Sequence, residues 1–179
     1  MTKLNRALYT PRLRLEPVTA ELSAIANDVR ALSRTLEAEI PTDWVRAGLP
    51  LVRQRLNPAS AWRPIRCVAV HRGDHVVVGD IRFERVRSGD DEDVYEIGYA
   101  IIPAYRRQGL AVEAAGRVID WLFDEARAAL VIAGCDRKNR GSVRTLRRLG
   151  FWLDGSRGSA FWWRMTAQLR HEHLRGVRG

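Results

Sequence analysis

One short segment constrains the fold more than any other part of this chain: residues 106–111, with the sequence Arg-Arg-Gln-Gly-Leu-Ala. Residues 94–102, just before it, are apolar and rich in β-branched and aromatic side chains, which is typical of a buried strand. After it, apolar residues recur at helical spacing on one face: Val112, Ala115, Ile119, Leu122 and Ala126. The pattern predicts a strand, a tight turn and an amphipathic helix in direct succession.

This turn has the features of an anion site. The first turn of a helix carries unpaired backbone N–H groups and the positive end of the helix dipole. Gly109 allows the backbone to approach a ligand closely, and Arg106 and Arg107 add positive charge. Two interpretations follow from the hexapeptide alone: a cradle for a pyrophosphate group, or an ordinary turn whose glycine fits the tight geometry.

A second segment, residues 139–151, favours the cradle, because it begins with Asn and ends in Leu-Gly-Phe. Together the two segments resemble the GNAT superfamily of acetyl-CoA-dependent N-acetyltransferases. The phosphate loop of that family reads Arg or Gln, two residues, Gly, one residue, and Gly or Ala. Arg106, Gly109 and Ala111 fill this pattern.

Three further features look most like the ribosomal-protein N-terminal acetyltransferase (Rim-type) branch. They are residues 96–99 (Glu-Ile-Gly-Tyr), the Asn139 and Ser142 pair, and residues 12–15 (Arg-Leu-Arg-Leu). The resemblance extends from residue 12 to residue 163. It implies a single α+β (mixed α/β) GNAT-like domain over residues 1–179, with a core over residues 12–166 and a mobile basic tail over residues 167–179. Its central mixed, largely antiparallel sheet would have about six to seven strands, splayed at the coenzyme site and flanked by helices.

The resemblance also implies the ligands. The acyl donor would be acetyl-CoA, and the acceptor a primary amine, either a protein N-terminal α-amine or a small-molecule amine. Backbone groups near Ile101 and Ile102 would pair with the pantetheine arm like an extra strand. The full set of residues expected to bind the coenzyme is Ile101, Ile102, Arg106, Arg107, Gln108, Gly109, Leu110, Ala111 and Asn139.

Acetyl transfer needs a base for the amine, and Glu96 is the candidate. Strand alternation places Glu96 on the same face as Gly98, which leaves room beside it for substrate. A carboxylate in a buried strand is costly unless it is paired or functional. The alternative is a structural glutamate paired with a neighbouring arginine.

Protonation of the departing thiolate needs an acid. Many superfamily members use a Tyr four residues before the Gly of Leu-Gly-Phe, but Leu146 stands there in this chain. The Rim-type branch implies Ser142 instead, and the alternative role for Ser142 is a helix N-cap. Asn139 would bind the pantetheine arm or an ordered water, with helix capping again the alternative.

Two residues depart from the family's pattern. Arg107 stands where relatives often carry Gly, so it either crowds the phosphate turn or adds a charge contact. Arg137 stands where Rim-type relatives often have Pro. Trp44 could line the acceptor cleft, although core packing is the default for a buried aromatic side chain.

The rest of the chain adds local predictions. Residues 65–70, 76–86 and 130–135 read as strands, and residues 151–154 and 160–165 as a final hairpin. Thr19 can cap one helix that carries Leu22, Ile25, Ala26, Val29 and Leu32. Residues 41–64 are broken by prolines and would form short helices and loops along one wall of the acceptor cleft, and residues 88–93 an acidic hairpin loop.

Composition narrows the class of protein. Hydrophobic residues make up 46% of the 179 residues, too many for a disordered chain. No apolar run approaches the ~20 residues that span a bilayer, and the N-terminus lacks the apolar core of a signal peptide. Two cysteines, Cys67 and Cys135, make no metal cluster and read as free thiols, so we expect a cytoplasmic protein without a metal.

The net charge of +9 leaves other functions open. A basic surface suits a nucleic-acid partner, although a coding bias toward arginine explains the same excess. One alternative is therefore a basic RNA- or ribosome-binding module with a vestigial coenzyme site. Another is an acyltransferase that uses a different donor, such as succinyl-CoA. In each case we expect a monomer or a homodimer.

Overall fold

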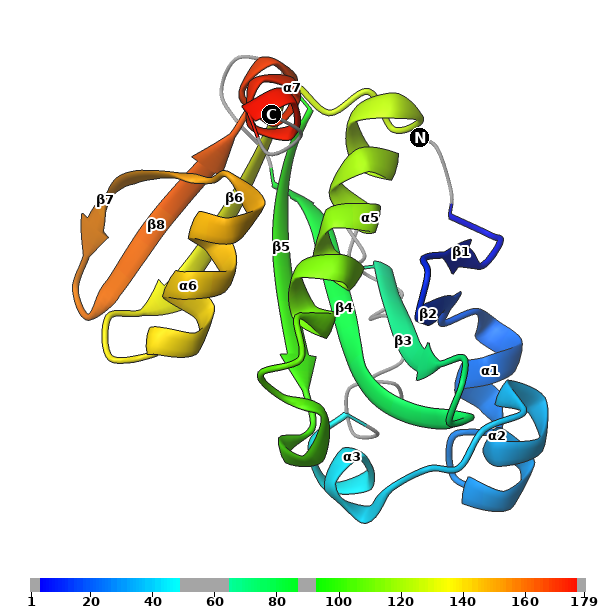
Figure 1. Ribbon diagram of the computed structural model, residues 1–179. Coiled ribbons are helices and arrows are strands. Elements are labelled where there is room, and N and C mark those ends of the chain that lie inside the picture. The colour runs from blue at the N-terminus through cyan, green and yellow to red at the C-terminus, as the bar shows by residue number, and fades with distance from the viewer. Residues whose placement is uncertain (1–3, 49–64, 87–92, 177–179) are drawn as a thin grey trace.

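The computed structural model describes residues 4–48, 65–86 and 93–176, which form a twisted sheet with helices on both faces (Figure 1). The strands are β1 (Leu8–Tyr9), β2 (Leu13–Pro17), β3 (Ile65–His71), β4 (Val76–Val86), β5 (Val94–Ile101), β6 (Leu130–Asp136), β7 (Trp152–Arg157) and β8 (Ala160–Met165). The helices are α1 (Ala20–Ala24), α2 (Val29–Leu36), α3 (Thr42–Ala47), the short 3-10 helix η1 (Pro103–Tyr105), α5 (Leu110–Asp124), α6 (Arg140–Leu149) and α7 (Ala167–Gly176).

The sheet is mixed and largely antiparallel, which confirms the predicted fold class. Its strand order is β1-β2-β3-β4-β5-β6-β8-β7, and only the β5–β6 pair is parallel. The described residues form eight strands rather than six to seven. The additional strand is β1, whose two residues are too few to show an alternating pattern in the sequence.

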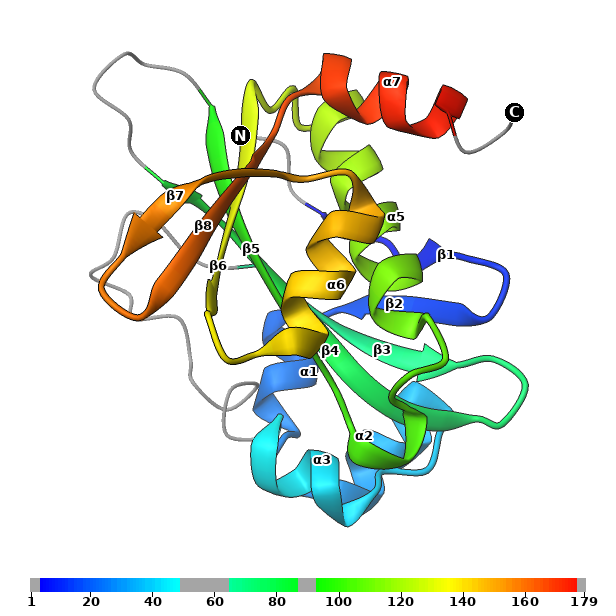
Figure 2. The ribbon, with the colours of Figure 1, turned by 60° about the vertical axis from the view of Figure 1, so that its left-hand side comes forward.

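Two hydrophobic cores lie on the two faces of the sheet because alternate strand residues point to opposite sides. On one face, α5 packs Ala115, Ile119 and Leu122 against strand residues such as Cys67 and Ile81. The other face is covered by α1, α2 and α3 (Figure 2). There Leu32, Leu36 and Trp44 pack against Val68 and Val77.

The predicted strand–turn–helix succession is present. Helix α5 begins directly after Gly109 and buries the apolar stripe that the periodicity predicts. The helix predicted after Thr19 is different, because two helices form there instead of one. Thr19 caps α1, and the Asp28 carboxylate then accepts hydrogen bonds from the N–H groups of Arg30 and Ala31, which starts α2 as a separate helix.

The C-terminal segment has structure that the sequence analysis did not predict. Residues 167–176 form α7, and Arg170 anchors this helix to α5 through the Asp120 carboxylate (Nε–Oδ1 2.9 Å). His173 Nε2 lies 2.9 Å from the carbonyl oxygen of Arg148 on α6. The mobility proposed for this tail stays a prediction.

Several predictions fall outside the described residues. These are the part of the proline-broken segment at 49–64 and most of the acidic loop, at 88–92. Cys67 and Cys135 are free thiols, as predicted, and burial raises the pKa of the Cys67 thiol to about 12. Among the described residues, no helix is both long and apolar enough to cross a membrane.

Candidate active site

Strands β5 and β6 separate in the middle of the sheet. Their parallel pairing comprises Val94 with Leu130, Tyr95 with Val131, and Glu96 with Ile132. Beyond this point β5 continues to Ile101 and β6 to Asp136 without pairing to each other, and each keeps its other neighbour, β4 or β8. The divergence is visible in Figure 1, and it confirms the predicted splay.

At the end of the open edge of β5, the backbone groups of Ile101 and Ile102 differ in whether they are hydrogen-bonded within the protein. Ile102 donates its N–H to the Val78 carbonyl (2.9 Å), and its own carbonyl accepts from Tyr105 (3.1 Å). Ile101 lies opposite Gly79, so alternation turns its N–H and C=O toward the side of β6. Both backbone groups of Ile102 are engaged within the protein, and the Ile101 carbonyl accepts from Arg106 Nε (2.9 Å), so of these four groups the Ile101 N–H is the one left for a ligand. The pairing with pantetheine stays a prediction.

The turn after β5 is tight, and a side chain ties it to the end of the strand. Arg106 is extended and donates from Nε to the Ile101 carbonyl (2.9 Å), so its side chain ties the turn to the end of β5. Arg107 has a φ of 62° and Gly109 a φ of 82°. Gly109 is the N-cap of α5, where a side chain in this backbone conformation would be strained.

The remaining residues of the turn serve different purposes. Arg106, Arg107 and Gln108 are exposed, so they can meet a ligand from solvent. Leu110 is buried in the core and anchors the start of α5, while Ala111 is half-buried. Arg107 has a left-handed backbone, a conformation in which glycine is favoured.

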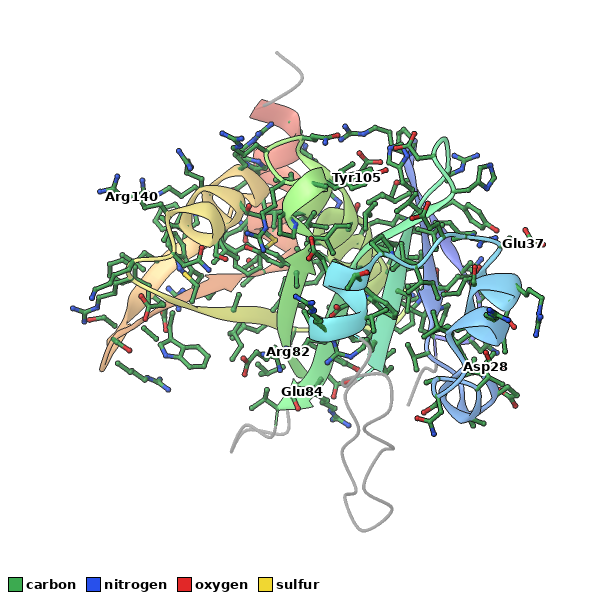
Figure 3. The ribbon with its side chains drawn as sticks, turned by 90° about the horizontal axis from the view of Figure 1, so that it is seen from below. Asp28, Glu37, Arg82, Glu84, Tyr105 and Arg140 are labelled. Atoms are coloured by element: carbon green, nitrogen blue, oxygen red, sulfur yellow. The ribbon has the colours of Figure 1, made fainter. Side chains whose placement is uncertain are left out.

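Glu96 is the last residue of β5 that pairs with β6. Its cross-strand partner on β4 is Glu84, and Arg82 lies opposite Gly98 (β4 is seen from below in Figure 3). Partial burial raises the pKa of Glu96 above its ordinary value, Arg82 opposes this shift, and Glu84 adds to it. Arg82 pairs with Glu84 (Nη1–Oε1 3.5 Å), and among the described residues no ion pair joins it to Glu96. The functional role of Glu96 stays a prediction.

The neighbour of Gly98 is the Arg82 side chain, where the sequence predicted open space for substrate. A Cβ atom at this position would lie 2.6 Å from Arg82 Nε. Gly98 therefore lets the Arg82 side chain lie across β5, and the space expected for substrate beside Glu96 is bordered by a guanidinium group. Sequence patterns did not reveal Arg82 or Glu84, because their place depends on the β4–β5 register.

Asn139 and Ser142 lie together at the start of α6. Asn139 is the N-cap, and its Oδ1 accepts from the Ser142 N–H (3.0 Å). Ser142 therefore does not cap this helix, which corrects that alternative. The Tyr99 hydroxyl donates to the Ser142 carbonyl (3.3 Å) from β5, and burial raises the pKa of Tyr99 to about 12. Leu146, in place of the family's tyrosine, is buried in the core.

Trp44 lies in the hydrophobic core on the α1–α3 face, with an exposed fraction of 1%. The structure thus places it as a packing residue rather than on an open cleft surface. Nearby on the same sheet face, Asp80 is 4% exposed and forms an ion pair with Arg66. This buried pair also escaped the sequence analysis, since β3 and β4 bring it together.

Arg137, which departs from the Rim-type pattern, makes two contacts within the protein. Arg137 donates its N–H to the Ser159 carbonyl (3.0 Å) and lies over the Phe161 ring (5.4 Å from its centre). Within the described parts of the chain, no group of three or more His, Cys, Asp or Glu side chains is arranged to hold a metal ion.

Comparison with known proteins shows which family this chain belongs to. Residues 12–152 match the model of the acetyltransferase (GNAT) domain family. The uncharacterized N-acetyltransferase YjdG of Bacillus subtilis is 28% identical over 153 residues, covering 82% of this chain and 90% of YjdG. This chain belongs to the GNAT acetyltransferase family.

Solved structures share the fold at low sequence identity. RimJ of Mycobacterium smegmatis, solved with CoA-disulfide, gives a TM-score of 0.63 at 20% identity, over 97% of this chain and 94% of RimJ. FdhC, described as a nucleotide-linked sugar GNAT, gives a TM-score of 0.67 at 14% identity, over 98% of each chain. These likenesses establish the fold.

Proposed function

We propose that this protein transfers an acetyl group from acetyl-CoA directly to a primary amine in a ternary complex. The observation that carries the proposal is the separation of β5 from β6 after Glu96, on the strand that leads into the turn before α5. Coenzyme enters such a gap with its phosphates at the turn and its thioester near the carboxylate. No covalent enzyme intermediate is required.

The coenzyme site combines backbone and side-chain groups. The N–H groups of residues 107–111 hold the pyrophosphate, with the charges of Arg106 and Arg107 beside it, because the Arg106 N–H already donates to the Pro103 carbonyl (3.2 Å). Ile101 offers its backbone N–H to the pantetheine arm along the open edge of β5, because its carbonyl already accepts from Arg106 Nε. Asn139 uses Oδ1 for the helix cap, so its amide NH₂ group is the part that can donate to the pantetheine or to water.

The chemistry divides between two residues. Glu96 accepts a proton from the acceptor amine, directly or through water, as the amine nitrogen attacks the thioester carbonyl carbon. The carbon–sulfur bond then breaks, and the Ser142 hydroxyl donates to the departing thiolate. The raised pKa of Glu96 suits a base that works near neutral pH.

The acceptor class has two candidates. The Rim-type features at residues 12–15, Glu96 and Ser142 support a protein N-terminal α-amine. The carboxylates of Glu84 and Glu96 on one sheet face support a cationic small-molecule amine. A screen of N-terminal peptides and amines with the wild type and Glu96→Gln distinguishes the two, since product must depend on Glu96 in either case.

A specific surface favours a polyanionic partner as a second candidate function. Exposed basic side chains cluster along α6 and the turn before it: Arg137, Lys138, Arg140, Arg144, Arg147 and Arg148. Arg140 extends away from the sheet in Figure 3. Steeply salt-dependent binding of RNA that Arg144→Glu weakens would support this candidate, and salt-independent or absent binding would remove it.

Coenzyme binding is the first test. We expect acetyl-CoA to raise the melting temperature saturably, and Arg107→Glu to weaken the affinity roughly tenfold by reversing a charge at the turn. Arg175→Glu on α7 makes the same charge change beside the opposite end of α5 and serves as the matched control. Absence of any stabilisation of the wild type at millimolar acetyl-CoA would contradict the proposed function.

A further inference from the structure

A carboxylate occupies the first turn of α5, where the proposed phosphate site needs positive potential. Glu113 donates its N–H to the Gly109 carbonyl (3.0 Å), the first hydrogen bond of this helix. Its side chain is 15% exposed, so solvent screens its charge poorly. An isolated negative charge here would repel the phosphates of a coenzyme bound at the same helix end.

The chain supplies a partner for both oxygens of this carboxylate. Glu113 Oε1 accepts from the Thr10 hydroxyl (2.6 Å) and from the Arg12 N–H (2.8 Å). Glu113 Oε2 meets the Arg12 guanidinium at Nε (2.7 Å) and Nη2 (2.6 Å). Although partial burial acts in the opposite direction, the hydrogen bonds from Thr10 and Arg12 lower the pKa of Glu113, so the carboxylate is ionised at neutral pH.

The same guanidinium also reaches the turn itself. Arg12 Nη1 donates to the carbonyl oxygen of Gln108 (3.0 Å). In a trans peptide the C=O and the following N–H point in opposite directions. Because Arg12 holds the Gln108 carbonyl on its own side, the N–H of Gly109 points away from Arg12.

We propose that Arg12 is a positioning residue for the phosphate-binding turn: it neutralises Glu113 and orients the peptide between Gln108 and Gly109. This inference rests on the proposed function, since it assumes that the turn binds the phosphates of acetyl-CoA. Arg12 and Glu113 are far apart in the sequence, and the packing of the N-terminal strands beside α5 brings them together. The N-terminal segment is thereby part of the coenzyme site.

The two roles of Arg12 predict an unusual pattern of mutant affinities. Arg12→Ala exposes the Glu113 charge and frees the turn, so acetyl-CoA should bind roughly tenfold more weakly by calorimetry. Glu113→Gln in the Arg12→Ala background removes the repulsion and should recover part of that loss. If Arg12 merely held the helix in place, the double variant would bind no better than Arg12→Ala.

A phosphate-free probe separates positioning from general damage. S-acetylpantetheine lacks the pyrophosphate, so Arg12→Ala should leave its affinity, or its use as a donor, within twofold of the wild type. Arg12→Lys keeps the positive charge without the planar guanidinium group, so its affinity for acetyl-CoA should lie between those of the wild type and Arg12→Ala. This variant keeps the test valid if Arg12→Ala folds poorly.

The chain contains a matched control for this pair. Arg6 joins the same N-terminal segment to the same helix through Glu125 (2.7 Å), but at the C-terminal end of α5. Arg6→Ala should therefore leave the affinity for acetyl-CoA unchanged. Equal affinities of the wild type and Arg12→Ala would overturn the inference alone, whereas a wild type that does not bind acetyl-CoA would overturn the proposed function and this inference together.

Discussion

At the scale of single residues, the face of the sheet that carries Glu96 is electrostatically mixed. Glu84 lies directly opposite Glu96, and Arg82 extends over Gly98 between the two strands. Like charges opposite each other across a pair of strands are unfavourable, so such a pair is a means of tuning a pKa. The pKa of Glu96, the proposed base, is thus adjusted by two neighbours that differ in charge, Arg82 and Glu84.

This arrangement predicts the pH dependence of acetyl transfer. The proposed base works when Glu96 is deprotonated, so the rate should rise with pH through its raised pKa. Glu84→Gln removes a negative neighbour, which should lower the pKa of Glu96 and shift the acidic limb to lower pH. Glu96→Gln should lower turnover and flatten that limb while acetyl-CoA still binds. A pH–rate profile of Glu96→Gln that matches the wild type would contradict the role of Glu96.

Arg107 has a second testable property, its left-handed backbone. Because a side chain with a Cβ atom is strained in this conformation, Arg107→Gly should raise the free energy of unfolding by about 1 kcal/mol. Denaturant unfolding measures this change. Arg106→Gly is the matched control, and it should lower stability because Arg106 is extended and bonded to the Ile101 carbonyl. Loss of stability in Arg107→Gly would show that the strain is not relieved.

At the scale of elements, the start of α6 holds two polar residues with different roles: one caps the helix, and the other is the proposed acid. Both Asn139 and Ser142 are residue types suited to capping, and their spacing alone does not decide which one caps. The backbone places Asn139 at the N-cap and Ser142 within the first turn. The Ser142 hydroxyl is therefore not needed for that cap.

The two alanine variants of α6 should separate these roles. Asn139→Ala should lower the free energy of unfolding by about 1 kcal/mol, because the Ser142 N–H loses its acceptor. Ser142→Ala should change stability by less than about 0.5 kcal/mol while it lowers turnover. Thermal unfolding and steady-state rates of both purified variants check this, and full activity of Ser142→Ala would exclude the hydroxyl as the acid.

At the scale of the whole molecule, α7 contacts both α5 and α6, and Figure 2 shows its place near them. Arg170 reaches Asp120 on α5 (2.9 Å) and the Leu149 carbonyl at the end of α6 (3.2 Å). The Arg170 side chain is 11% exposed and the Asp120 side chain 38%, so this ion pair is only partly shielded from solvent. The C-terminal helix thus supports the elements that border the proposed coenzyme site.

Removing this link should have a measurable cost. Arg170→Ala leaves the Leu149 carbonyl and Asp120 without their donor, so the free energy of unfolding should fall by about 1–3 kcal/mol. Exposed Arg175 on the same helix provides the control, and Arg175→Ala should change stability by less than about 0.5 kcal/mol. Equal midpoints of denaturation for both variants would show that α7 does not brace α5 and α6.

The sequence by itself determined the strand–turn–helix around Gly109, the alternation that puts Glu96 on its face, and the mixed sheet. These features follow from local periodicity and from the conformational needs of single residues. Tertiary structure alone decided that Glu84 opposes Glu96, that Arg12 meets Glu113, and that α7 is a docked helix. Such pairs depend on strand register and on packing between distant segments. The summed contacts of both cores select that register and packing, so no local sequence pattern encodes the pairs.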